Sequence, residues 1–551
     1  MRPTTACLAF LFAACVPASA GDIPGGGIDG EALMRHVQVL ASDGFEGRAP
    51  ATPGEERTIA YIMDELRKAG VQPGGPDGGW LQPVPLVRAR VDGEVRAAVH
   101  ANGETRELAN GEDLVLQTLQ PVERIEVERA PLVFVGYGIS APERGWDDYK
   151  GVDLRGKVAV VLINDPDFEA PEPGAFDGRG VTYHGRWTYK YEELARRGAT
   201  GALIVHETAP AAYGWGTVRS SGLSPLFDIP REDAMQTHTP LRGWIQRSLA
   251  EWLFARAGLD FEQEKKRAQT PGFTPVQLGD ATLSAAFSVV RDEVVTHNVI
   301  GRVEGAQAPD ETVIYSAHWD AYGVGEADAS GDTIRHGAVD NATGVAAVLE
   351  LARVFAAGPR PRRSVLFMAL TAEEKGLQGA NYYVAHPVVP LEKTAAVINI
   401  EMLSPDGPTR DLSSWGKGRV ELEEMLREAI EAQGRYYSPD PSPESGFFYR
   451  ADHFAFARAG VPAITVGAGL DRVDGGVDSG KALRDRYFAD CYHRPCDNWS
   501  PDWDISGQVQ DVEVLYALGR RIAGGTAWPQ WHEDSEFRAE RLRSEDARAA
   551  R

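Results

Sequence analysis

The second half of the chain alternates uninterrupted apolar runs with stretches of helical periodicity. Four apolar runs have the length of a buried strand: 313–317, 364–370, 395–400 and 463–467. Between the first two, Val345, Val348 and Leu349 fall on one face of a helix predicted over 339–355. Strands that are apolar throughout need cover on both faces, and helices supply it in α/β folds. The sequence therefore predicts an α/β fold, with a mixed, mostly parallel central sheet covered by helices on both faces.

Polar side chains gather where these predicted elements end or begin. Two histidines and five carboxylates stand there: His318, Asp320, Asp340, Glu373, Glu374, Glu401 and His493. Taken alone, each has an ordinary explanation; Asp340, for example, suits the N-cap of the following helix. Open α/β sheets bind ligands beyond the carboxyl ends of their strands, so separate loops can bring these groups into one crevice. We therefore expect a single polar site above the sheet.

Such a cluster holds too much negative charge to be buried without cations. Imidazole and carboxylate ligands suit zinc, and a bridging carboxylate can hold two ions about 3.5–4 Å apart. The neighbours Glu373 and Glu374 permit a division of labour. One can bind metal while the other takes a proton from a metal-bound water, whose pKa falls toward about 7. The composition of the cluster thus predicts a pair of divalent metals and hydrolytic chemistry.

Five short motifs carry a resemblance to a known family. They are His318-Trp-Asp320, Gly337-Ala-Val-Asp340-Asn-Ala-Thr-Gly344, Thr371-Ala-Glu373-Glu374-Lys-Gly376, Asn399-Ile-Glu401-Met and Tyr492-His493-Arg-Pro-x-Asp497. In this order they resemble metallopeptidase family M28, which includes secreted bacterial leucyl aminopeptidases and glutamate carboxypeptidase. The likeness covers 31–87 and 296–521. It implies a fold of the zinc exopeptidase type.

The resemblance also implies roles for the clustered residues. Two Zn²⁺ ions per chain would be held by five metal ligands: His318, Asp340, Glu374, Glu401 and His493. Asp340 would bridge the ions, and Glu373 would be the general base that activates the bridging hydroxide. Asp320 would orient the ring of His318. Tyr492 would polarise the carbonyl or stabilise the oxyanion. Glu401 departs from the family, which has Asp here, and its extra methylene displaces the carboxylate.

The chain divides into regions of different character. We predict a signal peptide over 1–20, a first part of the peptidase domain over 28–91, an inserted domain over 92–289, the catalytic zinc peptidase domain over 290–527 and a charged tail over 528–551. The insert contains short β-like runs such as 158–163 and 201–205, and it resembles a protease-associated domain. It has no compact cluster of metal ligands, so a lid or binding module is the simpler interpretation.

The N-terminus indicates export, and export in turn bears on the state of the cysteines. Residues 1–20 combine Arg2, an apolar stretch and the cleavage signal Ala18-Ser19-Ala20, which is typical of a secretory signal peptide. Lipid attachment at Cys15 is the alternative. We expect a periplasmic or extracellular protein, where Cys491 and Cys496 would pair and close a loop around His493. Binding of metal by the two sulfurs stays open.

The charge excludes one class of partner. Lys and Arg number 57 and Asp and Glu number 80, so the net charge is −23. Such a surface repels phosphate backbones, which argues against nucleic-acid binding. Outside the signal, we find no segment long and apolar enough to span a membrane. The oligomeric state and the preferred side chain of the substrate are not encoded in any pattern that we recognise.

We predict a secreted dizinc exopeptidase that acts on peptides, and favour an aminopeptidase. In such members of the family the substrate amine lies near the carboxylates, so Glu373 and Glu401 are candidates to bind it. A carboxypeptidase or dipeptidase would need an arginine for the substrate carboxylate, and four are available: Arg435, Arg450, Arg486 and Arg494. A receptor-like homologue without activity and a single-zinc glutaminyl cyclase are further alternatives.

Some polar residues near the motifs have weaker support as site residues. His336, His386 and His453 lie outside the five motifs, and we interpret them as structural. Asp452 belongs to a segment, Arg450 to Phe456, that resembles a stretch near the substrate pocket of the family. Its position suits a helix cap as well as a place in the site.

Overall fold

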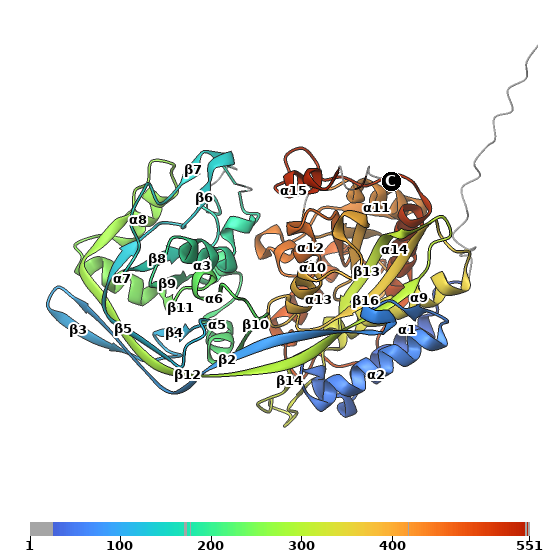
Figure 1. Cartoon of the computed structure of the whole chain (residues 1–551), viewed down its shortest axis with the longest axis horizontal. Coiled ribbons are helices and arrows are strands. Elements are labelled where there is room, and N and C mark those ends of the chain that lie inside the picture. Colours follow the sequence, from blue (N-terminus) through green and yellow to red (C-terminus); the bar gives the residue numbers. More distant parts are fainter. Residues whose placement is uncertain (1–25, 170–173, 177, 417, 546–547, 549–551) are drawn as a thin grey trace, which may run out of the picture.

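A computed structural model shows two lobes joined by a long β-ribbon (Figure 1). The structure describes residues 26–169, 174–176, 178–416, 418–545 and 548. The predicted signal peptide, Cys15 and the cleavage signal lie outside these residues. Among the helices that the structure describes, none combines the length and the apolar character needed to cross a membrane.

The larger lobe is built on a mixed sheet in the order β19-β18-β20-β17-β13-β16-β12. The strands are β12 (Val276–Val303), β13 (Ala308–His318), β16 (Arg363–Leu370), β17 (Thr394–Asn399), β18 (Asp411–Ser414), β19 (Tyr436–Ser438) and β20 (Ala463–Gly467). Strand β13 is parallel to β16 and β17, and β17 is parallel to β20. Strands β12 and β18 join antiparallel to this centre. The four apolar runs predicted as strands are its four central strands, which confirms the expected fold class.

Helices cover both faces of this sheet. The helices of the lobe are α1 (Gly30–Leu40), α2 (Pro53–Lys68), α9 (Thr343–Ala357), α10 (Gln378–Ala385), α11 (Leu422–Ala432), α12 (His453–Arg458), α13 (Gly476–Asp490), α14 (Ser506–Gly524) and α15 (Arg538–Arg543). Successive residues of β13 point to opposite faces. Val313 and Tyr315 belong to the core formed with α1, α2, α9, α11 and α14, whereas Ile314 packs in the core formed with α10 and α12. The strands are apolar throughout because neither face meets water.

The smaller lobe has its own sheet and core. Its strands follow the order β5-β8-β9-β11-β4, with β8 and β9 parallel to their neighbours on both sides. They are β4 (Leu114–Gln117), β5 (Arg124–Phe134), β8 (Val158–Leu162), β9 (Gly201–His206) and β11 (Leu241–Gln246). Helices α3 (Trp187–Arg196), α5 (Trp215–Leu223), α7 (Arg247–Arg256) and α8 (Phe261–Ala268) pack around this sheet.

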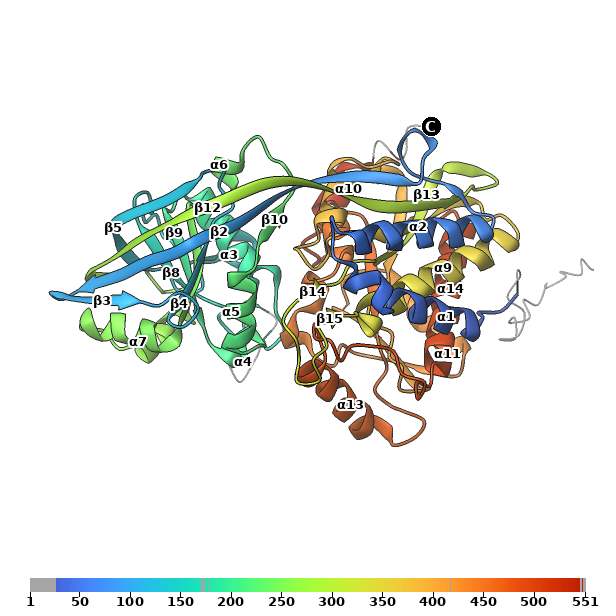
Figure 2. The ribbon, with the colours of Figure 1, turned by 90° about the horizontal axis from the view of Figure 1, so that it is seen from below.

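The ribbon between the lobes consists of β2 (Leu81–Ala101) and the long β12. These strands pair antiparallel from Leu81 opposite Val299 to His100 opposite Thr282, and Figure 2 shows them running along both lobes. One end of β12 also pairs with β16 and the other with β5. The predicted limits of the insert, 92 and 289, lie within these two strands. The pairing shifts register between Ala286 and Ser288, and from Ser288 to Val299 it continues without interruption toward the larger lobe.

The predicted charged tail contributes to the core of the larger lobe. Trp531 and Phe537 are buried within it, and the indole of Trp531 donates to the main-chain oxygen of Gly460. Arg541, a residue of α15, is buried, and its guanidinium donates to the main-chain oxygen of Thr394. The apolar residues hidden among the charges of this segment explain why it packs.

Candidate metal centre

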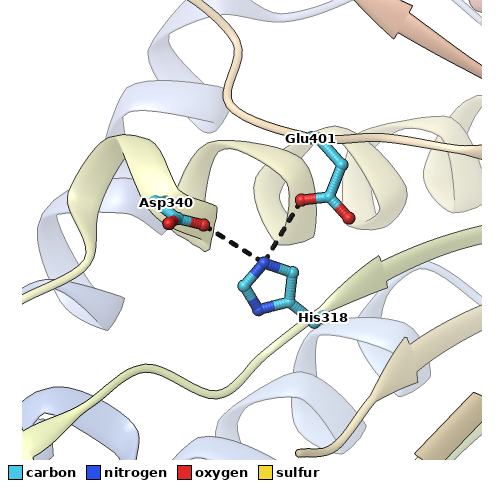
Figure 3. Close-up of side chains that lie close together, drawn as sticks. All are labelled: His318, Asp340 and Glu401. Carbon is cyan, nitrogen blue, oxygen red and sulfur yellow. Dashed lines mark ion pairs between the residues drawn. The ribbon is translucent and has the colours of Figure 1, made fainter. Parts of the chain in front are cut away.

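One triad of ligand groups lies above the carboxyl ends of β13 and β17. His318 is the last residue of β13, Glu401 follows the end of β17, and Asp340 stands in the turn before α9. The Nε2 atom of His318 lies 3.2 Å from Oδ1 of Asp340 and 3.2 Å from Oε2 of Glu401 (Figure 3). All three side chains are buried. Their ligand atoms are close enough together to hold a metal ion.

A second triad shares the same aspartate. Nε2 of His493 lies 3.2 Å from Oδ2 of Asp340 and 3.3 Å from Oε2 of Glu374. The two oxygens of Asp340 thus face two different imidazoles. This triad can also hold an ion. The structure brings all five predicted ligands together in the arrangement that a bridging carboxylate requires.

The electrostatics of the cluster favour bound cations. Burial, reinforced by neighbouring carboxylates, raises the pKa of both Glu373 and Glu374 well above the usual range. Burial opposes a charge on His318, yet Glu401 and Glu373 together raise its pKa well above the ordinary value. Oε1 of Glu374 is buried without a hydrogen-bond partner among the described residues, and Nε2 of His493, although close to two carboxylate oxygens, forms no well-aligned hydrogen bond with them. Two divalent ions would satisfy both the excess charge and these atoms, so the residues fit the metals.

Asp320 orients the cluster in two ways. Its main-chain oxygen lies 3.0 Å from Nδ1 of His318, and a carbonyl can only accept, so Nδ1 carries the proton and Nε2 is free to bind metal. Its carboxylate lies 3.7 Å from Nδ1 and instead accepts the main-chain N–H groups of Glu373 and Glu374 at 3.0 and 3.3 Å. The main-chain oxygen of Asp320 thus orients the imidazole of His318, as predicted for this residue. The side chain of Asp320 instead holds the backbone of Glu373 and Glu374.

Two asparagine amides hold the carboxylate of Glu401. Nδ2 of Asn399 donates to Oε1 at 2.9 Å, and Nδ2 of Asn341 donates to Oε2 at 2.9 Å. Each oxygen therefore has a fixed partner, and Oε2 still faces His318. These contacts hold the carboxylate of Glu401 in the first triad, despite its longer side chain.

The turn that carries Asp340 is fixed by Asp497. Oδ1 and Oδ2 of Asp497 accept the main-chain N–H groups of Val339 and Asp340 at 2.9 and 3.1 Å. Helix α9 begins only at Thr343, and Oδ1 of Asn341 accepts the N–H of Gly344 in its first turn. The interpretation of Asp340 as an N-cap is therefore wrong. A turn over Ala338–Ala342 precedes the helix and points the aspartate at the histidines.

Arg48 is a supporting residue that sequence reasoning missed. Its buried guanidinium donates to four main-chain oxygens, those of Leu40, Trp319, His336 and Gly337. Burial lowers the pKa of Arg48 to about 10. The side chain ties the loop after β13 to the turn that carries Asp340. The sequence offers no signal for this role, because Arg48 lies 270 residues or more from both metal-binding loops and belongs to none of the five motifs.

Aromatic rings surround His493. Cys491 and Cys496 form a disulfide, which confirms the predicted pairing and closes the loop that carries His493. The ring of Tyr492 stacks on the imidazole with centroids 3.6 Å apart, and the ring of Tyr322 lies 4.4 Å away. Burial raises the pKa of Tyr492 well above its ordinary value, so the phenol keeps its proton. A protonated phenol beside the cluster can donate a hydrogen bond to an oxyanion.

The histidines interpreted as structural lie outside both triads. His336 is held between the main-chain oxygen of Ala41 and the carboxylate of Asp332. Nδ1 of His453 lies 2.7 Å from Oγ1 of Thr465, and His386 packs against Tyr382. Asp452 stands at the N-cap of α12 but makes no capping bond. Its oxygens are buried without a partner among the described residues, and its carboxylate raises the pKa of Glu373, which places it beside the cluster.

The four candidate arginines differ in position. Arg435 pairs with Asp511 at 2.8 Å, Arg494 donates to the main-chain oxygen of Asp490, and Arg486 is exposed on α13. Only Arg450, of these four, contacts a predicted catalytic residue: its Nη2 lies 3.4 Å from Oη of Tyr492.

Comparisons with known proteins find relatives that are named as peptidases. Residues 298–517 match the model of the family described as peptidase family M28. A Pseudomonas aeruginosa protein named aminopeptidase is 29% identical over 488 residues, covering 84% of this chain and 75% of its own length. A Pyrenophora teres protein named probable zinc metalloprotease is 36% identical over 105 residues, which cover 19% of this chain and 22% of its own length. Several curated relatives are matched over only 17–24% of their own length.

A solved structure shares the fold. The aminopeptidase from Aneurinibacillus sp. strain AM-1 aligns with a TM-score of 0.52 at 19% identity, covering 91% of this chain and 95% of that chain. The alignment therefore extends over both lobes and the ribbon.

Proposed function

We propose that the chain is a zinc-dependent exopeptidase, specifically an aminopeptidase with two metal ions, because residues 298–517 match the model of peptidase family M28. The observation that carries this proposal is the pair of triads that share Asp340. The names of the relatives, aminopeptidase and zinc metalloprotease, support the same reaction class.

The two triads suit two zinc ions. His318 and Glu401 would hold one, His493 and Glu374 the other, with Asp340 bound to both. When bound, the metals would polarise the scissile carbonyl and lower the pKa of a water toward about 7. Neutral imidazole and carboxylate ligands match zinc better than Mg²⁺ or Ca²⁺, which take oxygen ligands almost alone.

Glu373 is the proposed general base. It stands next to the proposed ligand Glu374, its side chain is half-buried, and its backbone N–H is held by the carboxylate of Asp320. The carboxylate would take the proton from the attacking water and deliver it to the leaving amine. Tyr492, with its phenol protonated, would donate a hydrogen bond to the oxyanion that develops on the carbonyl oxygen.

The excess of carboxylates also suits an aminopeptidase. Glu373 and Glu401 belong to the cluster around the triads, where a carboxylate would accept hydrogen bonds from the ammonium group of a peptide N-terminus. Glu373 and Glu401 are the proposed partners of this group.

We also propose that the protein is exported. The apolar N-terminal stretch with Ala18-Ser19-Ala20 supports this, and a disulfide such as Cys491–Cys496 persists in oxidising compartments.

Matched reporters test the proposed activity. The purified chain should hydrolyse leucine p-nitroanilide and leave the N-acetylated reporter intact. Activity should disappear with a chelator and return with zinc, and metal analysis should give two zinc ions per chain. Cleavage of N-blocked peptides without cleavage of the free-amine reporter would overturn the aminopeptidase assignment. Less than one ion per chain, with no hydrolysis, would favour a receptor-like protein.

A further inference from the structure

A cavity of about 420 Å³ opens on the larger lobe between α11, α14 and the edge of the sheet. Its walls are formed by residues 409–410 before β18, residues 433–436 at the end of α11 and the start of β19, Val473, and Gln510 and Glu513 of α14. None of these residues belongs to the two metal triads. The volume lies in the range of small-molecule sites, so the polar groups of its walls indicate what it can bind.

Glu513 contributes a carboxylate without a basic partner to this cavity. Its side chain is half-buried, and Nε2 of Gln433 donates to its Oε2 at 3.2 Å. Within the part of the chain that the structure describes, Glu513 forms no ion pair with a basic side chain. Burial raises the pKa of Glu513, and no basic group opposes this effect. A cation bound in the cavity would offset the cost of removing this carboxylate from water.

Two further features of the walls favour a cationic donor. Oε1 of Gln510, one turn before Glu513 on α14, is buried without a hydrogen-bond partner among the described residues. Helix α11 ends at Ala432 beside the cavity, and no basic residue stands in its last turn to offset the partial negative charge of a helix C-terminus. An ammonium group has three N–H donors and a full positive charge, so it matches these acceptors.

The remaining walls offer one donor and an apolar surface. The buried guanidinium of Arg435 binds Asp511 through Nη1 at 2.8 Å and the main-chain oxygen of Asp411 through Nη2 at 2.7 Å. Its Nε is buried without a partner among the described residues, so one N–H group is available to an oxygen atom. Tyr436 and Val473 are exposed and provide apolar contact area.

We propose that this cavity is a second binding site, which takes an α-ammonium group together with its neighbouring carbonyl or carboxylate. Glu513 and Gln510 accept from the ammonium group, and Nε of Arg435 donates to the oxygen. The apolar side chain of the ligand lies against Tyr436 and Val473. A free amino acid and the N-terminus of a peptide share this chemistry. The site goes beyond the proposed function, because binding here requires no hydrolysis.

Calorimetric titrations of zinc-loaded Glu373→Gln, in which a tripeptide should stay intact, test this proposal. L-Leucine should bind at the cavity as well as at the metals, whereas N-acetyl-leucine, which has no ammonium group, should not bind at the cavity. Adding Glu513→Gln should weaken binding at the cavity about 10- to 100-fold, because a hydrogen bond to a charged group is lost. Gln510→Met removes the other acceptor and should also weaken it. Leu-Gly-Gly separates the two sources: its binding at the cavity would identify the peptide N-terminus as an occupant, and its failure to bind would assign the site to free amino acids.

A matched variant separates contact from overall charge. Glu431→Gln removes an equal charge from an exposed residue in the last turn of α11 that does not line the cavity, and it should leave binding unchanged. The same affinity for L-leucine with and without Glu513→Gln would overturn the proposal. An equal weakening in Glu431→Gln would also overturn it, because diffuse charge and no contact would then drive binding. Neither result bears on the aminopeptidase function, which reporter hydrolysis by the wild-type protein tests separately.

Discussion

Both lobes bury charged groups near the carboxyl ends of their strands, but they neutralise them differently. In the smaller lobe, Asp165 accepts the N–H and the hydroxyl of Thr182, and Nζ of Lys190 donates to the main-chain oxygens of Tyr137 and Asn164. Burial raises the pKa of Asp165 to about 7 and lowers that of Lys190 to about 8. Acid and base therefore balance within the chain.

The larger lobe lacks this balance. Asp340, Glu373, Glu374 and Glu401 outnumber the cationic groups that the chain places beside them, two imidazoles and the buried guanidinium of Arg48. Burial raises the pKa of Glu373 and Glu374 well above the usual range. Both lobes bury charged groups, so burial alone does not distinguish the candidate site. Its distinguishing feature is an excess of acidic groups over basic groups, which bound cations would offset.

The largest expected effect follows from breaking the bridge. Asp340→Asn leaves one charged oxygen ligand fewer for each triad, so metal content should fall from two ions per chain to at most one. The rate of hydrolysis should fall more than about 100-fold. That is the loss expected when only a residue that orients a metal ligand is removed, and Asp340 is itself a proposed ligand. Metal analysis and reporter kinetics on the same preparation check both results. Retention of two ions would contradict the shared role of Asp340.

Removal of the general base should separate metal binding from catalysis. Glu373→Gln should lower kcat about 100- to 10,000-fold, because a positioned general base contributes that much. The metal content should stay at two, since Glu373 belongs to neither triad. Glu326→Gln, at an exposed position, is the control and should behave as the wild-type protein. A comparable loss of metal in Glu373→Gln would place Glu373 among the ligands instead.

A smaller effect is expected from the amide that holds Glu401. Asn399→Ala removes the bond to Oε1, and metal affinity should fall about 10- to 100-fold, as for other partners that orient a ligand. Ser316→Ala removes the other bond of the same amide and leaves Glu401 held, so it should have little effect. Titration of the metal-free protein with zinc measures both. Equal affinities in the two variants would show that Asn399 does not orient Glu401.

The smallest effect on catalysis is expected in the other lobe. Lys190→Met leaves Asp165 buried without its balancing charge and should lower the free energy of unfolding by about 3 kcal/mol. Activity per folded molecule should be unchanged, because Lys190 hydrogen-bonds only to main-chain oxygens of the smaller lobe and contacts none of the proposed metal ligands. Denaturant unfolding and reporter kinetics provide the two readings. A large loss of activity in the folded variant would break the distinction between the lobes.

Position at strand ends made most of the candidate site predictable. His318 and Glu401 adjoin apolar runs that can only be buried strands, so their meeting above the sheet follows from topology. The family resemblance supplied the division of roles between Glu373 and Glu374. The disulfide followed from the two cysteines of the mature chain and the inferred compartment.

The supporting residues were not predictable in the same way. Arg48, Asn341 and Asp497 act on main-chain groups or carboxylates brought near by loops whose paths no periodicity encodes. The turn before α9 likewise has no signature that separates it from a first helical turn, which is why Asp340, taken alone, also suits an N-cap.

Anomalous diffraction at the zinc edge, from crystals of the zinc-loaded protein, tests the central claim most directly. Two peaks are expected on either side of Asp340, one beside His318 and Glu401 and the other beside His493 and Glu374. A single peak that Asp340 does not touch, or no peak between the two histidines, would contradict the account.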